Sequence, residues 1–160
     1  MTIYRSFSSA ATKRFGKELA KKILSARGGS AFGGKNKPAK KAVVIGLVGE
    51  LGAGKTTFTQ GFAAGLGIRG KTQSPTFILM RNTKLRNSKF GNFIHIDAYR
   101  ADAGDFLKLG FRKISEGLKN IILIEWADKL KRILPKSAIW LKFGHGKKIN
   151  ERIITVNNEL

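Results

Sequence analysis

Three short apolar runs divide the chain: Ala42 to Val48, Phe93 to Asp97 and Ile121 to Glu125. They are rich in β-branched residues, and continuous runs of this length are typical of strands that are buried on both faces, as in a parallel sheet. Segments with helical spacing of apolar residues precede and separate these runs. The pattern therefore predicts an α/β fold around a central, largely parallel sheet.

Weaker patterns predict the remaining elements. An amphipathic helix is expected at 12–24, where Phe15, Leu19, Ile23 and Leu24 recur at helical spacing between lysines. The other expected elements are, in chain order, a helix at 57–66, a strand at 76–80, a hairpin turn at 81–91, one or two short helices at 105–118, a short basic helix at 129–134, and an antiparallel strand pair at 138–143 and 151–156.

Composition narrows the class of protein. The 160 residues suit one domain, 1–160, with its own core. Cysteine is absent, which excludes disulfides and thiolate metal sites, and the two histidines, His95 and His145, lie too far apart in sequence to favour a zinc site. Apolar runs are too short to span a bilayer, so we expect a soluble, cytoplasmic protein that needs no membrane.

The formal net charge of +21 predicts attraction to polyanions, nucleic acid first among them, although a lysine-rich proteome would produce the same excess without a docking face. Residues 1–41 hold eleven Lys or Arg and one acid, Glu18. We expect residues 1–11 to be a flexible N-terminus and residues 26–41 to be a basic, Gly/Lys-rich loop. The stretch from Met1 to Lys17 also has the composition of an organellar transit peptide.

The segment 49–56 reads Gly-Glu-Leu-Gly-Ala-Gly-Lys-Thr, the phosphate-binding P-loop pattern, between a predicted strand and a predicted helix. Its glycines allow successive N–H groups to point at phosphate oxygens, and the helix N-terminus adds further donors. Lys55 would reach the β- and γ-phosphates, and the Thr56 hydroxyl would ligate Mg²⁺. A glycine-rich turn with a chance Gly-Lys-Thr is the alternative. We predict that the protein binds a nucleoside triphosphate.

Two carboxylates end apolar runs, Asp97 and Glu125. At the carboxyl ends of parallel strands near a P-loop, either can hold Mg²⁺ directly or through water, or can simply cap the next element. We interpret His95 either as a structural residue or as support for the site, and not as a metal ligand. Ser74 and Thr76 could sense a γ-phosphate or its metal, as switch segments do, although a proline turn before an edge strand explains them equally well.

The class of nucleotide follows from motifs that are missing. A GTPase needs an aspartate after Asn/Thr-Lys-x, which Asn82 to Leu85 lacks, and an Asp-x-x-Gly switch, which occurs nowhere in the chain. A small-molecule kinase remains open, although no Arg-rich lid stands out. ATP with Mg²⁺ is therefore favoured, with the acceptor undefined.

Five ordered motifs together resemble the TsaE family over about residues 12–156. They are 49–59, Ser74-Pro-Thr-Phe77, His95-Ile-Asp-Ala-Tyr-Arg100, Leu109-Gly110 and Ile124-Glu-Trp126. The resemblance implies a P-loop NTPase-like sandwich with antiparallel C-terminal strands. It also implies an ATPase, weak alone, of bacterial tRNA threonylcarbamoyladenosine biosynthesis. Such a protein works with TsaB- and TsaD-type partners on the adenosine next to the anticodon of tRNA.

The resemblance also assigns roles. It implies that Lys55, Asp97 and Glu125 are catalytic and that Thr56 and Glu125 hold Mg²⁺. Residues expected at ATP or ADP are Gly49, Glu50, Leu51, Gly52, Ala53, Gly54, Lys55, Thr56, Thr57, Ser74, Thr76 and Trp126. Ala98 and Ala127 stand where the family usually has Leu and Pro, which affects local packing only. A stand-alone RNA-binding P-loop protein and a small-molecule kinase remain the alternatives.

Overall fold

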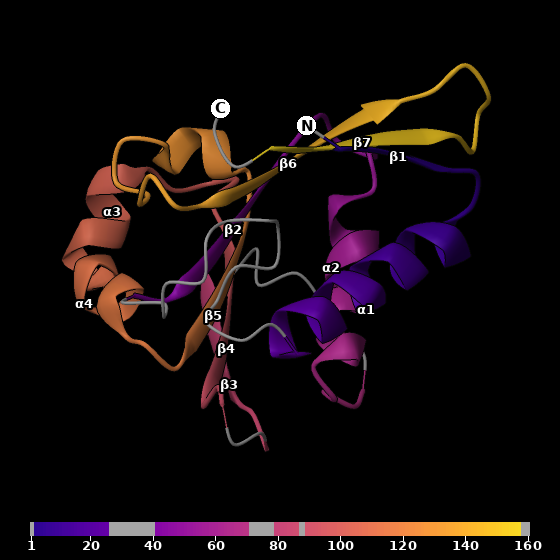
Figure 1. Ribbon diagram of the computed structural model, residues 1–160. Helices are drawn as coiled ribbons and strands as arrows, with labels where there is room; N and C mark the ends of the chain where they lie inside the picture. Colours follow the sequence, from indigo (N-terminus) through magenta and orange to yellow (C-terminus); the bar gives the residue numbers. More distant parts are fainter. Residues whose placement is uncertain (1, 26–40, 71–78, 87–88, 158–160) are drawn as a thin grey trace.

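A twisted sheet forms the centre of the computed structural model, which describes residues 2–25, 41–70, 79–86 and 89–157 (Figure 1). Within these residues the sheet has seven strands in the order β1-β7-β6-β2-β5-β4-β3. The strands are β1 (Thr2–Ser6), β2 (Val43–Val48), β3 (Met80–Lys84), β4 (Asn92–Asp97), β5 (Asn120–Glu125), β6 (Ile139–His145) and β7 (Arg152–Asn157).

The four central strands, β6, β2, β5 and β4, are parallel. β3 pairs antiparallel with β4, β7 pairs antiparallel with β6, and β1 pairs antiparallel with β7. This arrangement confirms the predicted α/β class, the largely parallel centre and the antiparallel C-terminal pair. The continuous apolar run at 121–124 predicts a strand covered on both faces, as in a parallel sheet, and residues 121–125 of β5 are indeed all buried. Ile121 and Leu123 belong to the core cluster on one face, whereas Ile122 and Ile124 belong to the cluster on the other.

Helices cover both faces of the sheet. In Figure 1, α1 (Ser9–Ser25) and α2 (Lys55–Gly65) lie on one side, and α3 (Ala103–Lys108) and α4 (Phe111–Glu116) lie on the other, where the 3-10 helix η1 (Ala127–Leu130) also packs. Helices α1 and α2 cross in backbone contact: a Cβ atom on Gly61 would lie 2.0 Å from the Lys13 carbonyl oxygen. No helix among these described residues is long and apolar enough to cross a membrane.

The N-terminus differs from expectation. Residues 1–11 were expected to be flexible, but Thr2–Ser6 forms β1 along β7, and α1 already begins at Ser9. Pairing with β7 and contacts with α1 supply the order: the Tyr4 ring stacks on Phe15 with centroids 4.3 Å apart, and the Ser6 and Thr12 hydroxyls hydrogen-bond at 2.7 Å. Residues 1–11 mix apolar and polar side chains without a clear strand pattern, so the sequence gives no local sign of these contacts.

The predicted boundaries around β3 are also wrong. The strand runs over Met80–Lys84 and pairs with β4, so residues 81–84 belong to a strand and not to the expected turn. It is the edge strand of the sheet and exposes Arg81, Asn82 and Lys84, which explains its polar pattern. The expected helix at 129–134 is wrong over most of its length: the 3-10 helix η1 spans Ala127–Leu130, and no helix continues beyond it. Most of the predicted strand 76–80 and all but Lys41 of the basic loop 26–41 lie outside the described residues.

Candidate functional site

The loop between β2 and α2 requires glycine at three positions. Gly49, Gly52 and Gly54 have φ angles of 147°, 75° and 102°, a region that side chains disfavour. A Cβ atom on Gly49 would also lie 2.4 Å from the Phe143 carbonyl oxygen. Gly54 precedes the first turn of α2, and no side-chain hydrogen bond caps this terminus. Its N–H groups therefore suit an anion at the start of a helix.

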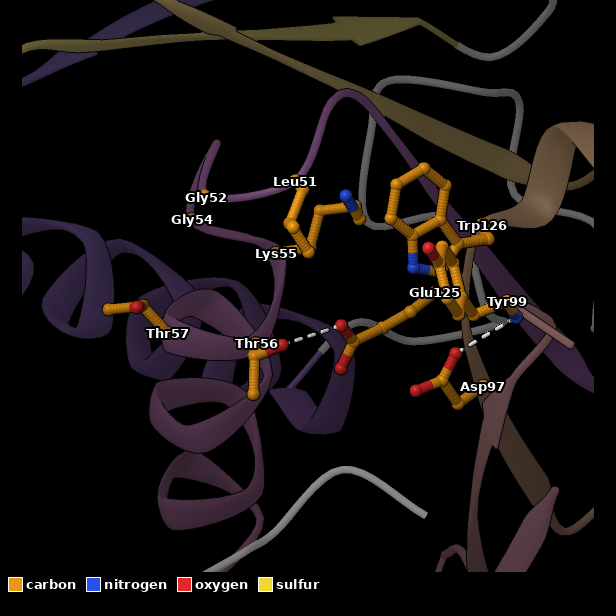
Figure 2. Close-up of a pocket in the computed structure, with 10 residues that line it drawn as sticks. All are labelled: Leu51, Gly52, Gly54, Lys55, Thr56, Thr57, Asp97, Tyr99, Glu125 and Trp126. Atoms are coloured by element: carbon orange, nitrogen blue, oxygen red, sulfur yellow. Dashed lines mark hydrogen bonds between the residues drawn. The ribbon is translucent and has the colours of Figure 1, made fainter. Parts of the chain in front are cut away.

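Lys55, the first residue of α2, points across this loop (Figure 2). Its Nζ donates to the carbonyl oxygens of Gly49 at 2.6 Å and Glu50 at 2.8 Å, and it lies 3.7 Å from the centroid of the Trp126 ring. Burial lowers the pKa of Lys55, while the carboxylates of Glu125, Asp128 and Asp97 act in the opposite direction. The ammonium is thus partly stripped of water, and the negative charge of a phosphate would favour its charged form.

Glu125 accepts hydrogen bonds from α2 and from β4. The Thr56 hydroxyl donates to Oε2 at 2.8 Å, the bond drawn in Figure 2, and Thr59 approaches Oε1 at 3.2 Å. His95 Nε2 lies 3.0 Å from Oε1, and both side chains of this pair are buried. The residues expected to hold a metal, Thr56 and Glu125, are therefore adjacent, and hydroxyl and carboxylate oxygens are the ligands that Mg²⁺ prefers.

Asp97 ends β4 directly opposite Glu125 in the parallel ladder. Its Oδ1 accepts a hydrogen bond from the Tyr99 backbone N–H at 3.0 Å, so it does cap the turn after the strand. The side chain also faces the same cleft as Glu125 (Figure 2). The capping and site interpretations of Asp97 are therefore compatible.

These side chains line one cleft with a volume of about 320 Å³. The cleft is lined by Leu51, Gly52, Gly54, Lys55, Thr56, Thr57, Asp97, Tyr99, Glu125 and Trp126. Of the other expected residues, Gly49 and Glu50 contribute the carbonyls that hold Lys55, and Ala53 is a buried residue of the loop itself. Ser74 and Thr76 lie outside the described residues.

Trp126 and Tyr99 close the cleft on the side of β5. Trp126 has a φ of 59°, an uncommon conformation for a residue with a side chain, and its ring lies 5.0 Å from that of Tyr99. Tyr99 was not singled out from the sequence, although it follows Asp97 by two residues and is 46% exposed. Strained backbone beside a cleft is typical of functional sites.

A second, smaller cleft of about 180 Å³ lies on the other side of the loop. It shares Gly52, Gly54 and Thr57 with the first and is completed by Ser8, Ser9 and Thr12 of the α1 region and by Asn150 and Arg152 at the start of β7. Arg152 Nε donates to the Gly52 carbonyl oxygen at 3.3 Å. Sequence reasoning missed these residues, because they reach the loop through tertiary contacts: α1 packs on α2, and β7 pairs with β6 and β1.

The oxygen donors in the first cleft fit a hard divalent cation that brings further ligands with it. Thr56, Glu125 and Asp97 supply one hydroxyl and two carboxylates. Across the described part of the chain, no group of three or more His, Cys, Asp or Glu residues is positioned to hold a metal ion alone. Mg²⁺ usually binds in this way, with one or two carboxylates, several waters and substrate phosphates.

Comparison with known proteins gives consistent results. A family model described as "Threonylcarbamoyl adenosine biosynthesis protein TsaE" matches residues 6–154. A Haemophilus influenzae protein named tRNA threonylcarbamoyladenosine biosynthesis protein TsaE is 35% identical over 127 residues, which are 79% of this chain and 71% of that protein. A Bacillus subtilis protein of the same name is 39% identical over 101 residues, which are 63% of this chain and 61% of that protein.

A solved structure is similar in three dimensions. The crystal structure of Bacillus subtilis YdiB superposes with a TM-score of 0.70 at 28% sequence identity, covering 97% of this chain and 83% of that one. The likeness thus extends over the sheet and both helical layers, whereas the family model reaches from the end of β1 into β7. The chain belongs to the TsaE family.

Proposed function

We propose that the protein is a Mg²⁺-dependent ATPase that serves the threonylcarbamoyl modification of the adenosine next to the anticodon in tRNA, together with TsaB- and TsaD-type partners. The nucleotide part rests on one observation: Lys55, the uncapped start of α2 and the Thr56–Glu125 hydrogen bond meet in a single cleft. The pathway part rests on family membership and on the names of the relatives.

The two clefts suggest how the nucleotide would lie. Phosphates would bind over the loop at the start of α2, where Lys55 and backbone N–H groups converge. The cleft with Asp97 and Glu125 would take the terminal phosphate, and the polar cleft with Ser8 and Arg152 would take the nucleoside end. Gly52, Gly54 and Thr57 line both, so one extended ligand could occupy the two clefts together.

Each polar side chain then has a distinct task. Lys55 would exchange the carbonyls of Gly49 and Glu50 for phosphate oxygens and offset their charge. Thr56 and Glu125 would hold Mg²⁺, which supplies charge stabilisation to the transferring phosphoryl group. Asp97, oriented by its bond from the Tyr99 N–H, would position the attacking water.

Contact with tRNA is supported by charge. The chain carries a formal +21, and α1 carries five exposed basic residues, Lys13, Arg14, Lys17, Lys21 and Lys22. Such a surface attracts the phosphate backbone without reading sequence. We therefore propose that tRNA binds to the complex and that these basic residues of α1 contribute to the binding.

A reconstituted reaction tests the proposal. The purified protein is mixed with TsaB- and TsaD-type partners, ATP, Mg²⁺ and tRNA, and both phosphate release and modified adenosine are measured. Wild-type protein should support both, Lys55→Ala should support neither, and Lys136→Ala, a change at an exposed lysine outside both clefts, should behave as wild type. Tight, salt-sensitive tRNA binding without turnover would instead favour an RNA-binding module, and a phosphorylated small molecule would favour a kinase.

A further inference from the structure

His95 and Glu125 form a buried pair beside the first cleft. Both side chains are 2% exposed, and Nε2 lies 3.0 Å from Oε1. The parallel register sets Asp97 opposite Glu125 and His95 opposite Leu123, so the imidazole reaches the carboxylate diagonally across the ladder. His95 itself does not line the cleft. Any effect that it has on a ligand must therefore pass through Glu125.

The two oxygens of Glu125 have different surroundings. Oε2 accepts from Thr56, a residue that lines the cleft. Oε1 is approached by two groups, but the Thr59 hydroxyl has a single proton and also lies 3.0 Å from the Lys55 carbonyl oxygen, closer than the 3.2 Å to Oε1. His95 Nε2–H is thus the donor to Oε1 that faces no such competition. It fixes one oxygen and leaves the other turned toward Thr56.

The second nitrogen of the ring argues against a purely structural histidine. Among the described residues, His95 Nδ1 is the buried side-chain atom for which no hydrogen-bond partner is found. An unpaired buried polar atom is unfavourable, and an apolar side chain packed beside Phe93, whose ring is 6.3 Å from the imidazole, would avoid that cost. The useful part of the ring is therefore the Nε2–H that reaches Glu125.

We propose that His95 is a positioning residue for the metal-binding carboxylate. Its Nε2–H holds Glu125 Oε1, so that Oε2 stays beside the Thr56 hydroxyl, where a nucleotide-bound Mg²⁺ would bind. This rests on the proposed function, because it assumes that the protein binds Mg²⁺ with a nucleotide. Hydrogen bonds that orient a metal ligand typically change metal affinity by 10–100-fold when they are removed.

Two nearly isosteric substitutions test the role of the donor. Gln and Met occupy similar volumes, but only Gln can donate a hydrogen bond to Oε1. ADP affinity is measured by calorimetry with Mg²⁺ and with EDTA, and the ratio of the two affinities reports the metal. In His95→Met this ratio should fall at least about tenfold with affinity in EDTA retained, and His95→Gln should recover most of the loss. His145→Gln, at the exposed second histidine, should match the parent.

The outcomes separate the two proposals. If the parent binds no ADP, or binds it equally with and without Mg²⁺, the proposed function fails and the role of His95 fails with it. If the parent shows the Mg²⁺ effect and His95→Met keeps the full ratio, only the positioning role is overturned. Equal losses in His95→Met and His95→Gln, or a loss that is as large in EDTA, would also overturn it, because they indicate packing and not donation.

Nitrogen NMR of the unmodified protein gives a test that needs no variant to fold. With two histidines in the chain, long-range proton–nitrogen spectra can be assigned to His95 and His145. We expect the proton of His95 on Nε2, and we expect its Nε2 signal to shift when Mg²⁺ is added to the ADP complex while that of His145 does not. A proton on Nδ1 alone, or a His95 signal that is indifferent to Mg²⁺, would refute the proposal.

Discussion

Gly61→Ala tests whether α1 and α2 meet through their backbones. The added Cβ atom would lie 2.0 Å from the carbonyl oxygen of Lys13 and 2.6 Å from its Cα atom. Reaching an ordinary contact of about 3.5 Å requires the helices to separate by roughly 1.5 Å. Backbone atoms cannot rotate away as a flexible side chain can. The separation would also loosen the contact between the rings of Phe15 and Phe58, which are tilted to each other with centroids 5.7 Å apart.

The sign of the effect makes the test sharp. In a helix with open space around it, Gly→Ala stabilises by about 1 kcal/mol, whereas overpacking a core typically costs about 1–3 kcal/mol and occasionally more. We expect the clash to prevail, with a net loss of roughly 1–3 kcal/mol and a melting temperature lower by several degrees. Urea and thermal denaturation followed by circular dichroism measure it.

Ala64→Ser supplies the matched control for Gly61→Ala. It also adds one heavy atom to α2, but on the exposed side of the helix, so it should change stability by less than about 1 kcal/mol. A denaturation midpoint of Gly61→Ala equal to or above that of the parent would show that the two helices do not touch in this way.

Three further outcomes are expected. Lys55→Ala should lose about 1.5–3 kcal/mol of ATP binding free energy in calorimetry, because a charge-assisted contact disappears; unchanged affinity, with Lys136→Ala as the control, would contradict the site. Glu125→Gln should weaken Mg²⁺-dependent ADP binding, whereas Asp97→Asn should spare ADP binding and lower turnover, and equal effects on ADP affinity would refute this division. The hydrogen bond from the Lys148 backbone N–H holds the pKa of Glu151 below its ordinary 4.5. The Lys147 N–H and Arg5 act in the same direction, whereas desolvation acts against them. The stability that the ionised carboxylate contributes is therefore present above that value and is lost as pH falls through the lower, folded-state pKa. The urea midpoint of Glu151→Gln should lie below that of the parent at pH 7, and the difference should shrink as the pH is lowered below 4.5. A difference that stays constant with pH would exclude this cause.

The buried strands could be predicted from the sequence because both of their faces are apolar. The runs at 42–48, 93–97 and 121–125 match β2, β4 and β5 to within one residue at either end. Strands at the two edges of the sheet were not predictable in the same way. β1 and β3 expose most of their side chains, so tertiary pairing with β7 and β4, and not local pattern, decides where they begin and end.

The site residues also divide into those that the sequence predicts and those that depend on tertiary contacts. Lys55, Thr56, Asp97 and Glu125 could be located because each lies at a strand end or a helix start, and parallel strands bring such ends to one edge of the sheet. The contact of His95 with Glu125 could not be predicted, because it depends on the register between β4 and β5. Both strands are apolar on both faces, so the sequence pattern does not select one register over another.

Strand order explains why the motif describes only half of the proposed nucleotide site. The P-loop follows β2. The parallel neighbour of β2 is β5, which delivers Glu125 to the first cleft, and β4 beside it delivers Asp97. On its other side β2 pairs with β6, and the antiparallel extension through β7 and β1 carries Arg152 and Ser8 to the second cleft. The first cleft uses residues next to strongly apolar runs, and such runs can be recognised in the sequence. The second cleft uses polar residues from turns and a helix start, whose meeting place exists only once the outer strands have paired.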